Sequence, residues 1–176
     1  KRDISYFRFF IKLLSILLLL ITAPIFVFIS LLIYIESGSR VIFKQARIGL
    51  HKKEFIIYKF KTMENNKVTF MGRFLRKLGV DELPQLINII KGEMNFIGPR
   101  PLTKYDIDRL GWDEGKYYKR WETKPGITGV SQLSKVCDAA ITMKNDLYYV
   151  ENRSKVFDLK IIVKTLLIPF IGKPTN

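Results

Sequence analysis

Cysteine and histidine are almost absent from this sequence, and their scarcity excludes several kinds of site. Cys137 is the only cysteine, so no disulfide can form within the chain, which fits a reducing compartment. With His51 as the only histidine, the chain lacks the nitrogen and sulfur ligands of a zinc site. No Walker A motif and no GxGxxG motif occurs either. Any bound metal should therefore have oxygen ligands, and Mg²⁺ is the expected ion.

Acidic residues are also few, with 16 Asp and Glu against 30 Lys and Arg and a formal net charge of +14. This excess predicts an anionic partner, which could be nucleic acid, an acidic lipid surface or a phosphorylated substrate. Hydrophobic residues make up 48% of the 176 residues and charged residues 26%. That composition is typical of one compact unit with a single strongly apolar region.

The apolar region is a run from Leu13 to Ile33 without a charged residue. A helix of this length reaches about 31 Å, which is enough to cross the hydrocarbon core of a bilayer. The run is too long for a signal peptide, and no small-residue cleavage site follows it. Pro24 lies near its centre and predicts a kink or break.

Basic residues flank the apolar run on both sides. They are Lys1, Arg2, Arg8 and Lys12 before it, and Arg40, Lys44, Arg47, Lys52 and Lys53 after it. The positive-inside rule therefore puts both ends in the cytoplasm, as in a re-entrant helix that enters and leaves on one side. A tilted helix that spans the membrane is the alternative, and these observations leave both open.

One β-hairpin and two rigid loops are predicted in the remainder of the chain. Val41–Gln45 and Glu54–Phe60 are rich in β-branched and aromatic residues and are joined by a segment that contains Gly49. Ile97–Pro101 and Lys124–Gly129 are punctuated by proline and glycine, which is typical of rigid loops.

The other predicted elements are helices. An amphipathic basic helix is expected around residues 70–78, and a second helix from Asp81 that ends at Gly92. Asp138 should cap a helix that runs to residue 149, and residues 156–170 should form an apolar helix interrupted by two lysines. The first and last of these helices are predicted to lie in the membrane interface, although an ordinary surface helix would give the same pattern.

Asp81 and Glu82 are the best candidates for catalytic carboxylates. Adjacent side chains on a helix point about 100° apart, so the pair cannot form a close aspartic dyad. One carboxylate could attack or bind a metal while the other orients it or moves a proton. Nearby cations suit a pyrophosphate; they are Arg73, Arg76, Lys77 and Arg100. On these grounds alone, capping of the helix is the simpler explanation of the acidic pair.

Three sequence blocks resemble the bacterial sugar transferase family. They are KFKTM at Lys59–Met63, DELPQLINIIKGEMNFIGPRP at Asp81–Pro101 and KPGITGVSQ at Lys124–Gln132. The apolar N-terminus, the QARIGL loop at Gln45–Leu50 and the closing DLK helix also match, so the resemblance covers nearly the whole chain. Blocks of this length and order are specific, and they favour a catalytic role for the acidic pair over capping.

The chain is most similar to the small members of the family, the monotopic phosphoglycosyl transferases. The resemblance implies transfer of a phosphosugar from a UDP-sugar to a polyprenyl phosphate (undecaprenyl phosphate), with release of UMP, with Mg²⁺ and through an aspartyl phosphosugar. It implies that Asp81 is the nucleophile and metal ligand and that Glu82 is its general acid/base partner. Arg76, Arg100 and Lys59 match basic positions expected to hold phosphates.

The resemblance also implies a fold and a location. The fold is mainly α with a small β-hairpin, with residues 1–36 as a re-entrant membrane helix and residues 37–176 as a compact catalytic domain surrounded by interfacial helices. The expected location is the cytoplasmic face of the bacterial inner membrane, in contact with membrane lipids. There a polyprenyl phosphate presents its head group and a cytosolic UDP-sugar can reach it.

The sequence departs from the family pattern at four places. Ile48 stands where the family usually has proline, and Ala23 stands where serine is expected. The segment Glu64–Val80 is short, and Ser134–Ala140 lacks the expected Asn-Gly-Arg pattern. The last departure concerns the donor, so the sequence does not identify the sugar.

Two other functions fit less well. A membrane-anchored adaptor with a basic lipid-binding face and no chemistry is the main alternative, and it leaves the acidic pair among so many cations unexplained. A nucleic-acid-binding domain would place basic and aromatic residues on a soluble face, which the apolar run contradicts, so no nucleic acid is expected as a partner.

Overall fold

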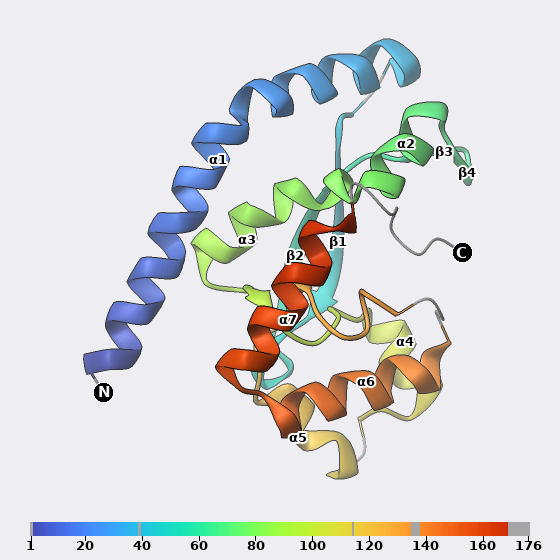
Figure 1. Cartoon of the computed structure of the whole chain (residues 1–176). Helices are drawn as coiled ribbons and strands as arrows, with labels where there is room; N and C mark the ends of the chain where they lie inside the picture. Colours follow the sequence, from blue (N-terminus) through green and yellow to red (C-terminus); the bar gives the residue numbers. More distant parts are fainter. Residues whose placement is uncertain (1, 39, 114, 135–137, 169–176) are drawn as a thin grey trace.

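The computed structural model describes residues 2–38, 40–113, 115–134 and 138–168. Most of this part of the chain is helical (Figure 1). The helices are α1 (Arg2–Ser37), α2 (Phe70–Leu78), α3 (Leu86–Lys91), α4 (Lys104–Leu110), α5 (Tyr118–Trp121), α6 (Ala139–Asn152) and α7 (Lys155–Leu166). Short 3₁₀ helices lie at Leu50–Lys52, Val80–Gln85 and Gly115–Tyr117. The strands pair as β1 (Ile42–Ile48) with β2 (Glu54–Phe60), β3 (Met63–Glu64) with β4 (Lys67–Val68), and β5 (Asn95–Ile97) with β6 (Gly126–Thr128).

The predicted hairpin is confirmed, and its register decides which side chains share a face. β1 and β2 are antiparallel, and their paired residues run from Ile42 opposite Phe60 to Ile48 opposite Glu54. β1 extends beyond the predicted end at Gln45 and continues through residues 46–48. Since side chains alternate along a strand, Arg47, Ile57 and Lys59 lie on the same face of this hairpin.

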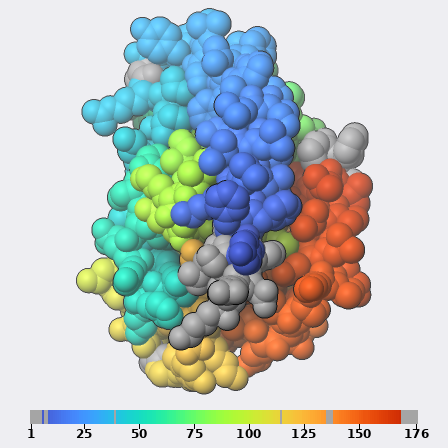
Figure 2. All heavy atoms as spheres, turned by 90° about the vertical axis from the view of Figure 1, so that its left-hand side faces the viewer, coloured from blue at the N-terminus to red at the C-terminus, as the bar shows by residue number. Residues whose placement is uncertain are grey.

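Helix α1 carries the apolar run and is continuous from Arg2 to Ser37, with Pro24 inside it. The helix bends along its length, and it lies on the outside of the molecule (Figures 1 and 2). Only 11% of its most apolar window is buried within the protein. A core helix of a soluble protein would be mostly covered, so this exposed apolar surface indicates association with a membrane.

One stripe of α1 packs on the rest of the domain. Ile11, Leu18 and Leu19 contact a cluster formed by β2, α3 and Met94, while Ile29 and Ile33 join a second cluster with Phe60 and Leu75. Hydroxyl groups in the helix donate to carbonyl oxygens one turn earlier, as Ser15 does to Ile11 at 2.8 Å. The packed stripe extends over both halves of the helix, on either side of Pro24.

Helix α2 forms at the predicted residues 70–78 and is capped at both ends. Thr69 Oγ1 accepts a hydrogen bond from the Gly72 amide, and Gly79 ends the helix with a left-handed φ of 72°. The Glu36 carboxylate, from the end of α1, also accepts from the amide of Phe70 at 2.7 Å. This contact joins the apolar helix to the N-terminus of α2, where a negative charge is favourable.

Two sequence predictions are corrected by the structure. The chain from Val80 to Gln85 forms a 3₁₀ helix, and the α-helix α3 begins only at Leu86. Pro84 lies just before this point, and its nitrogen cannot donate a backbone hydrogen bond. The segments predicted as rigid loops contribute to a short parallel ladder, in which Asn95 is opposite Gly126 and Ile97 is opposite Thr128. Glycine at position 126 allows this close approach of two backbones.

The C-terminal helices follow the prediction more closely. Asp138 caps α6, which continues to Asn152, and Ser154 caps α7. Phe70 and Phe74 of α2 and Leu159 and Val163 of α7 are exposed, as the interfacial interpretation expects. The expected end of the last helix at residue 170 lies outside the described residues.

Candidate active site

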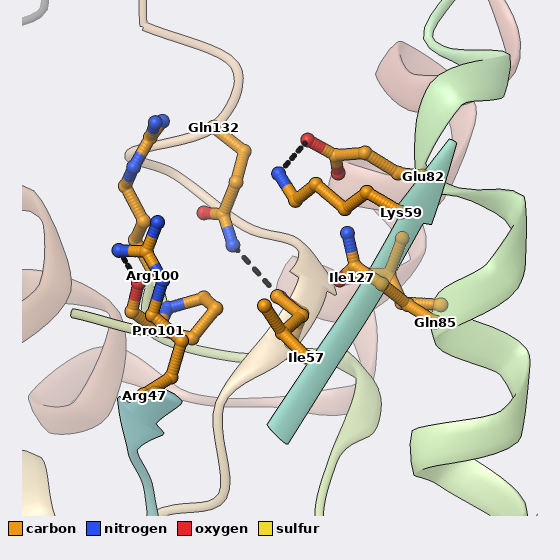
Figure 3. A pocket seen from close by; sticks show the side chains of 10 residues that line it. Arg47, Ile57, Lys59, Glu82, Gln85, Arg100, Pro101, Ile127 and Gln132 are labelled. Atoms are coloured by element: carbon orange, nitrogen blue, oxygen red, sulfur yellow. Dashed lines mark hydrogen bonds and ion pairs between the residues drawn. The ribbon is translucent and has the colours of Figure 1, made fainter. Parts of the chain in front are cut away.

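A pocket lies between the hairpin, the 3₁₀ helix Val80–Gln85 and the loops after β5 and β6 (Figure 3). It has an empty volume of about 310 Å³, part of it open to solvent. Its lining residues are Arg47, Ile57, Lys59, Glu82, Gln85, Arg100, Pro101, Gly126, Ile127 and Gln132.

Lys59 and Glu82 form an ion pair at one side of the pocket (Figure 3). Lys59 Nζ lies 3.1 Å from Glu82 Oε1, and both side chains are largely buried, with exposures of 25% and 14%. Lys59 comes from the end of β2, and Glu82 comes from the first turn of the 3₁₀ helix. The ion pair therefore joins β2 to the 3₁₀ helix at this side of the pocket.

Asp81 precedes Glu82 in the same turn but is not one of the residues that line the pocket. Its side chain is buried, with 7% exposure. Arg76, in the last turn of α2, also lies outside the lining, and its Nε donates to Thr62 Oγ1 at 2.9 Å. Gly79 joins the two elements, because it ends α2 and begins the 3₁₀ helix. The pocket thus gathers Glu82, Lys59 and Arg100 of the five predicted site residues, with Asp81 next to Glu82 in the chain.

Arg47 is a pocket residue to which the sequence analysis gave no role in the site. Its Nη1 donates to the Pro101 carbonyl at 3.2 Å, so β1 and the loop that carries Arg100 are joined directly. Burial lowers the pKa of Arg47, and the nearby positive charge of Arg100 lowers it further. A guanidinium nevertheless keeps its charge in proteins. Two guanidinium groups beside one pocket form a site for an anion.

Gln132 is a second pocket residue whose role the sequence did not indicate. Its Nε2 donates to the carbonyl oxygens of Gly126 at 3.0 Å and Gly98 at 3.4 Å. Because these two acceptors require the amide nitrogen, the orientation of the side chain is determined. Oε1 is buried and has no hydrogen-bond partner within the part of the chain that the structure describes. Gln132 therefore holds two loops together and has an acceptor left for a ligand.

The donor set can be tested against Mg²⁺. Among the described residues, no three His, Cys, Asp or Glu side chains converge as a complete metal site. Mg²⁺ is commonly held by one or two carboxylates together with substrate phosphates and water. Asp81 and Glu82 provide such oxygen donors next to a cationic pocket, so the residues fit an ion shared with a bound phosphate.

Comparison with known proteins gives consistent matches along the chain. The family model for bacterial sugar transferases matches residues 5–172. The chain is 39% identical over 166 residues to the uncharacterized sugar transferase EpsL of Bacillus subtilis (strain 168), covering 86% of this chain and 81% of EpsL. It is 34% identical over 181 residues to the UDP-glucose:undecaprenyl-phosphate glucose-1-phosphate transferase of Escherichia coli (strain K12), covering 91% of this chain and 39% of that enzyme.

A third relative is the UDP-N-acetylgalactosamine-undecaprenyl-phosphate N-acetylgalactosaminephosphotransferase of Aeromonas hydrophila. Identity to it is 34% over 163 residues, covering 82% of this chain and 38% of that enzyme. The chain therefore spans most of EpsL and about two fifths of the other two relatives.

These matches define the class of the protein, which is an enzyme, a phosphoglycosyl transferase. Within that class, the chain belongs to the bacterial sugar transferase family, as its three sequence blocks predicted. The Ser134–Ala140 segment, which departs from the family pattern, lies partly outside the described residues because the structure does not describe 135–137.

Proposed function

We propose that this enzyme transfers a phosphosugar from a UDP-sugar to undecaprenyl phosphate and releases UMP. The relatives from Escherichia coli and Aeromonas hydrophila are named for reactions of this kind. The observation that carries the proposal is the pocket, which is lined by Arg47, Lys59 and Arg100 and by a single carboxylate, Glu82, with Asp81 as the residue before it in the chain. A membrane-anchored adaptor without chemistry has no need for such a site.

The charges in the pocket suit the diphosphate of a nucleotide sugar. Three cationic side chains against one carboxylate leave a positive excess, which would offset the negative charge of the diphosphate. That excess also lowers the repulsion between the diphosphate and an attacking carboxylate. In this proposal Arg47 and Arg100 hold the phosphates from one side, while Lys59 keeps Glu82 in place from the other.

Asp81 is the proposed nucleophile. A carboxylate oxygen attacks the phosphorus next to the sugar, the bond from that phosphorus to the bridging oxygen breaks, and UMP leaves with the electron pair. An oxygen of undecaprenyl phosphate then attacks the same phosphorus, and the acyl phosphate bond breaks to restore the carboxylate. Glu82 accepts a proton from the incoming phosphate or returns one to the leaving group. The burial of Asp81 would protect the acyl phosphate from water between the two steps.

Mg²⁺ would be held by Asp81 together with phosphate oxygens, and it would neutralise part of the charge on the diphosphate. Glu82 is close enough in the chain to share this task. The donor chemistry of these two carboxylates supports Mg²⁺ over a zinc-type ion.

Helix α1 is proposed to be re-entrant, with both ends on the cytoplasmic face of the inner membrane and residues 37–176 as the catalytic domain. The contacts from Ile11 to Ile33 support this arrangement, because both halves of the helix pack on the same domain. A spanning helix would carry part of that domain through the bilayer with it. In the re-entrant arrangement, Glu36 and Lys12, near the two ends of the apolar run, would both lie at the interface.

The experiment that tests the mechanism is the search for a covalent intermediate. The purified enzyme is incubated with a UDP-sugar and Mg²⁺ without acceptor, and its intact mass is measured. A phosphosugar adduct should form, disappear on addition of undecaprenyl phosphate, and be absent in Asp81→Asn, which should also release no UMP. Asp108→Asn, an exposed aspartate on α4, is the matched control and should keep both adduct and turnover. Full turnover in Asp81→Asn would show that another group attacks; no turnover of any UDP-sugar by the wild type would favour the adaptor.

A further inference from the structure

A buried ion pair lies behind the pocket, between two helices that contribute no lining residue. Arg120 of α5 and Asp146 of α6 are 3% and 1% exposed, and Arg120 Nη2 lies 2.8 Å from Asp146 Oδ2. Arg120 Nε donates to the same oxygen at 2.9 Å. Burial lowers the pKa of the Arg120 guanidinium, while the charge of Asp146 opposes that shift. Arginine remains protonated under these conditions, so the pair is ionic.

The pair holds the backbone of Arg100 at both of its polar groups. The Arg100 amide donates to the Asp146 carboxylate at 3.2 Å, and the Arg100 carbonyl accepts a hydrogen bond from Arg120 Nη2. Ser131 Oγ lies 2.6 Å from Asp146 Oδ1 and completes the bonding of the carboxylate. Pro99 and Pro101 flank Arg100 and restrict its backbone further.

The side chain of Arg100 is not held in the way that its backbone is. Arg100 is an exposed residue, and it lines the pocket. A long exposed side chain has several rotamers, so its reach depends on where its Cα is held. An ion pair in this place is a poor means of stabilising a fold, because a well-packed apolar pair is often as stable. What an apolar pair cannot do is bind the amide and the carbonyl of one residue.

We propose that Arg120 and Asp146 are positioning residues that place Arg100 for binding of the donor diphosphate. The inference rests on the proposed role of Arg100 in holding the phosphates of the UDP-sugar. It gives a function to α5 and α6, which lie at one end of the molecule beside α4 (Figure 1). A shift of the Arg100 backbone by about 1 Å would move its guanidinium away from the phosphate, and such displacements are costly in catalysis.

The test is a double-mutant cycle on the affinity for UDP, measured by titration calorimetry with the full chain in detergent. Arg100→Ala should weaken UDP binding by roughly 10- to 100-fold, as expected for a lost charged hydrogen bond. Asp146→Asn should weaken it by roughly tenfold in the wild-type background and hardly at all in the Arg100→Ala background. The loss of thermal stability caused by Asp146→Asn should be the same in both backgrounds.

Two further variants keep the test decisive. Ser131→Ala removes one hydrogen bond from Asp146 and should give a smaller change with the same dependence on Arg100, even if Asp146→Asn does not fold. Tyr149→Phe is the matched control on α6, since it removes a hydrogen bond to Asp158 and should leave UDP affinity unchanged.

The outcomes separate the inference from the proposed function. An equal effect of Asp146→Asn or Ser131→Ala in both backgrounds, or loss of stability without loss of affinity, would overturn the positioning role alone. Unchanged UDP affinity in Arg100→Ala would overturn the proposed role of Arg100 and the inference with it.

Discussion

Substitution of Gly126 by alanine should separate the two loops that form one wall of the pocket. A Cβ atom at this position would lie 2.1 Å from the backbone nitrogen of Gly98 and 2.5 Å from the carbonyl carbon of Ile97. Both neighbours are backbone atoms, one in the last residue of β5 and one in the residue after it, so no side chain can rotate away. Since non-bonded contacts need about 3.5 Å, β5 and β6 would have to move apart by about 1 Å or more.

The cost follows from the overlap and from the hydrogen bonds beside it. Overpacking of this kind costs about 1–3 kcal/mol. Separation of the strands also weakens the bond from Gly126 N to the Pro99 carbonyl at 3.0 Å and that from Gly98 N to the Thr128 carbonyl at 3.0 Å. Each such bond contributes about 1 kcal/mol, so the total loss is roughly 3 kcal/mol or more. For a chain of this size, that lowers Tm by roughly 6–12 °C.

Gly126→Ala should also reduce turnover strongly, even at temperatures where the variant is still folded. Pro99 and Gly98 precede Arg100 in the loop, and Gln132 reaches both Gly98 and Gly126, so the displacement passes to the cationic side of the pocket. A misplacement of about 1 Å can reduce turnover by about 100-fold. The assays are thermal unfolding in detergent and the initial rate of UMP release at a temperature where the variant is folded.

Gly115→Ala is the matched control, because a Cβ atom there would meet no atom within 4 Å. It should change the free energy of unfolding by less than about 0.5 kcal/mol and leave turnover unchanged. A Gly126→Ala enzyme with the wild-type Tm and turnover would refute the argument that the close approach of β5 and β6 shapes the pocket.

Two more predictions concern the membrane helix and the C-terminal helices. Replacement of both Ala23 and Pro24 by leucine should straighten α1 and move the N-terminus across the membrane, so that an N-terminal tag becomes labelled from outside intact cells; labelling of the wild-type tag from outside would contradict the re-entrant proposal. Tyr149 has a raised pKa, mainly because of burial and also because its hydroxyl donates to Asp158, so the unfolded chain ionises first as the pH rises. The stability from this group is therefore complete below pH of about 10 and falls above it, by up to about 1.4 kcal/mol per pH unit. Urea unfolding between pH 9 and pH 11 should show this slope in the wild type and a smaller one in Tyr149→Phe, and equal slopes would count against it.

Local signals in the sequence predicted the elements whose stability is local. Thr69 and Gly79 bound α2 through capping bonds within one turn, and Asp138 begins α6 in the same way. The hairpin follows from β-branched and aromatic residues on either side of a short connection. The prediction of an α-helix from Asp81 was wrong about its start, since Pro84 delays the α-helical hydrogen bonds until Leu86.

The site was predictable in part, and the family resemblance supplied most of that part. Asp81, Glu82 and Lys59 stand in the sequence blocks that indicated them, although the acidic pair alone looked like a helix cap. The re-entrant path of α1, the role of Mg²⁺ and the catalytic roles of the acidic pair stay predictions. The pairing of Lys59 with Glu82 depends on β2 lying against the 3₁₀ helix.

The sequence by itself determined the apolar helix, the hairpin, the capped helices and the cationic character of the protein, because each depends on neighbours within a few residues or on composition. Only the tertiary structure decided that Arg47 meets the loop of Arg100, 54 positions away from Pro101 in the chain. It alone placed Arg120 and Asp146 on the two sides of the Arg100 backbone. These contacts join segments far apart in the sequence, and no local periodicity or capping pattern encodes which distant backbone group a buried side chain will reach.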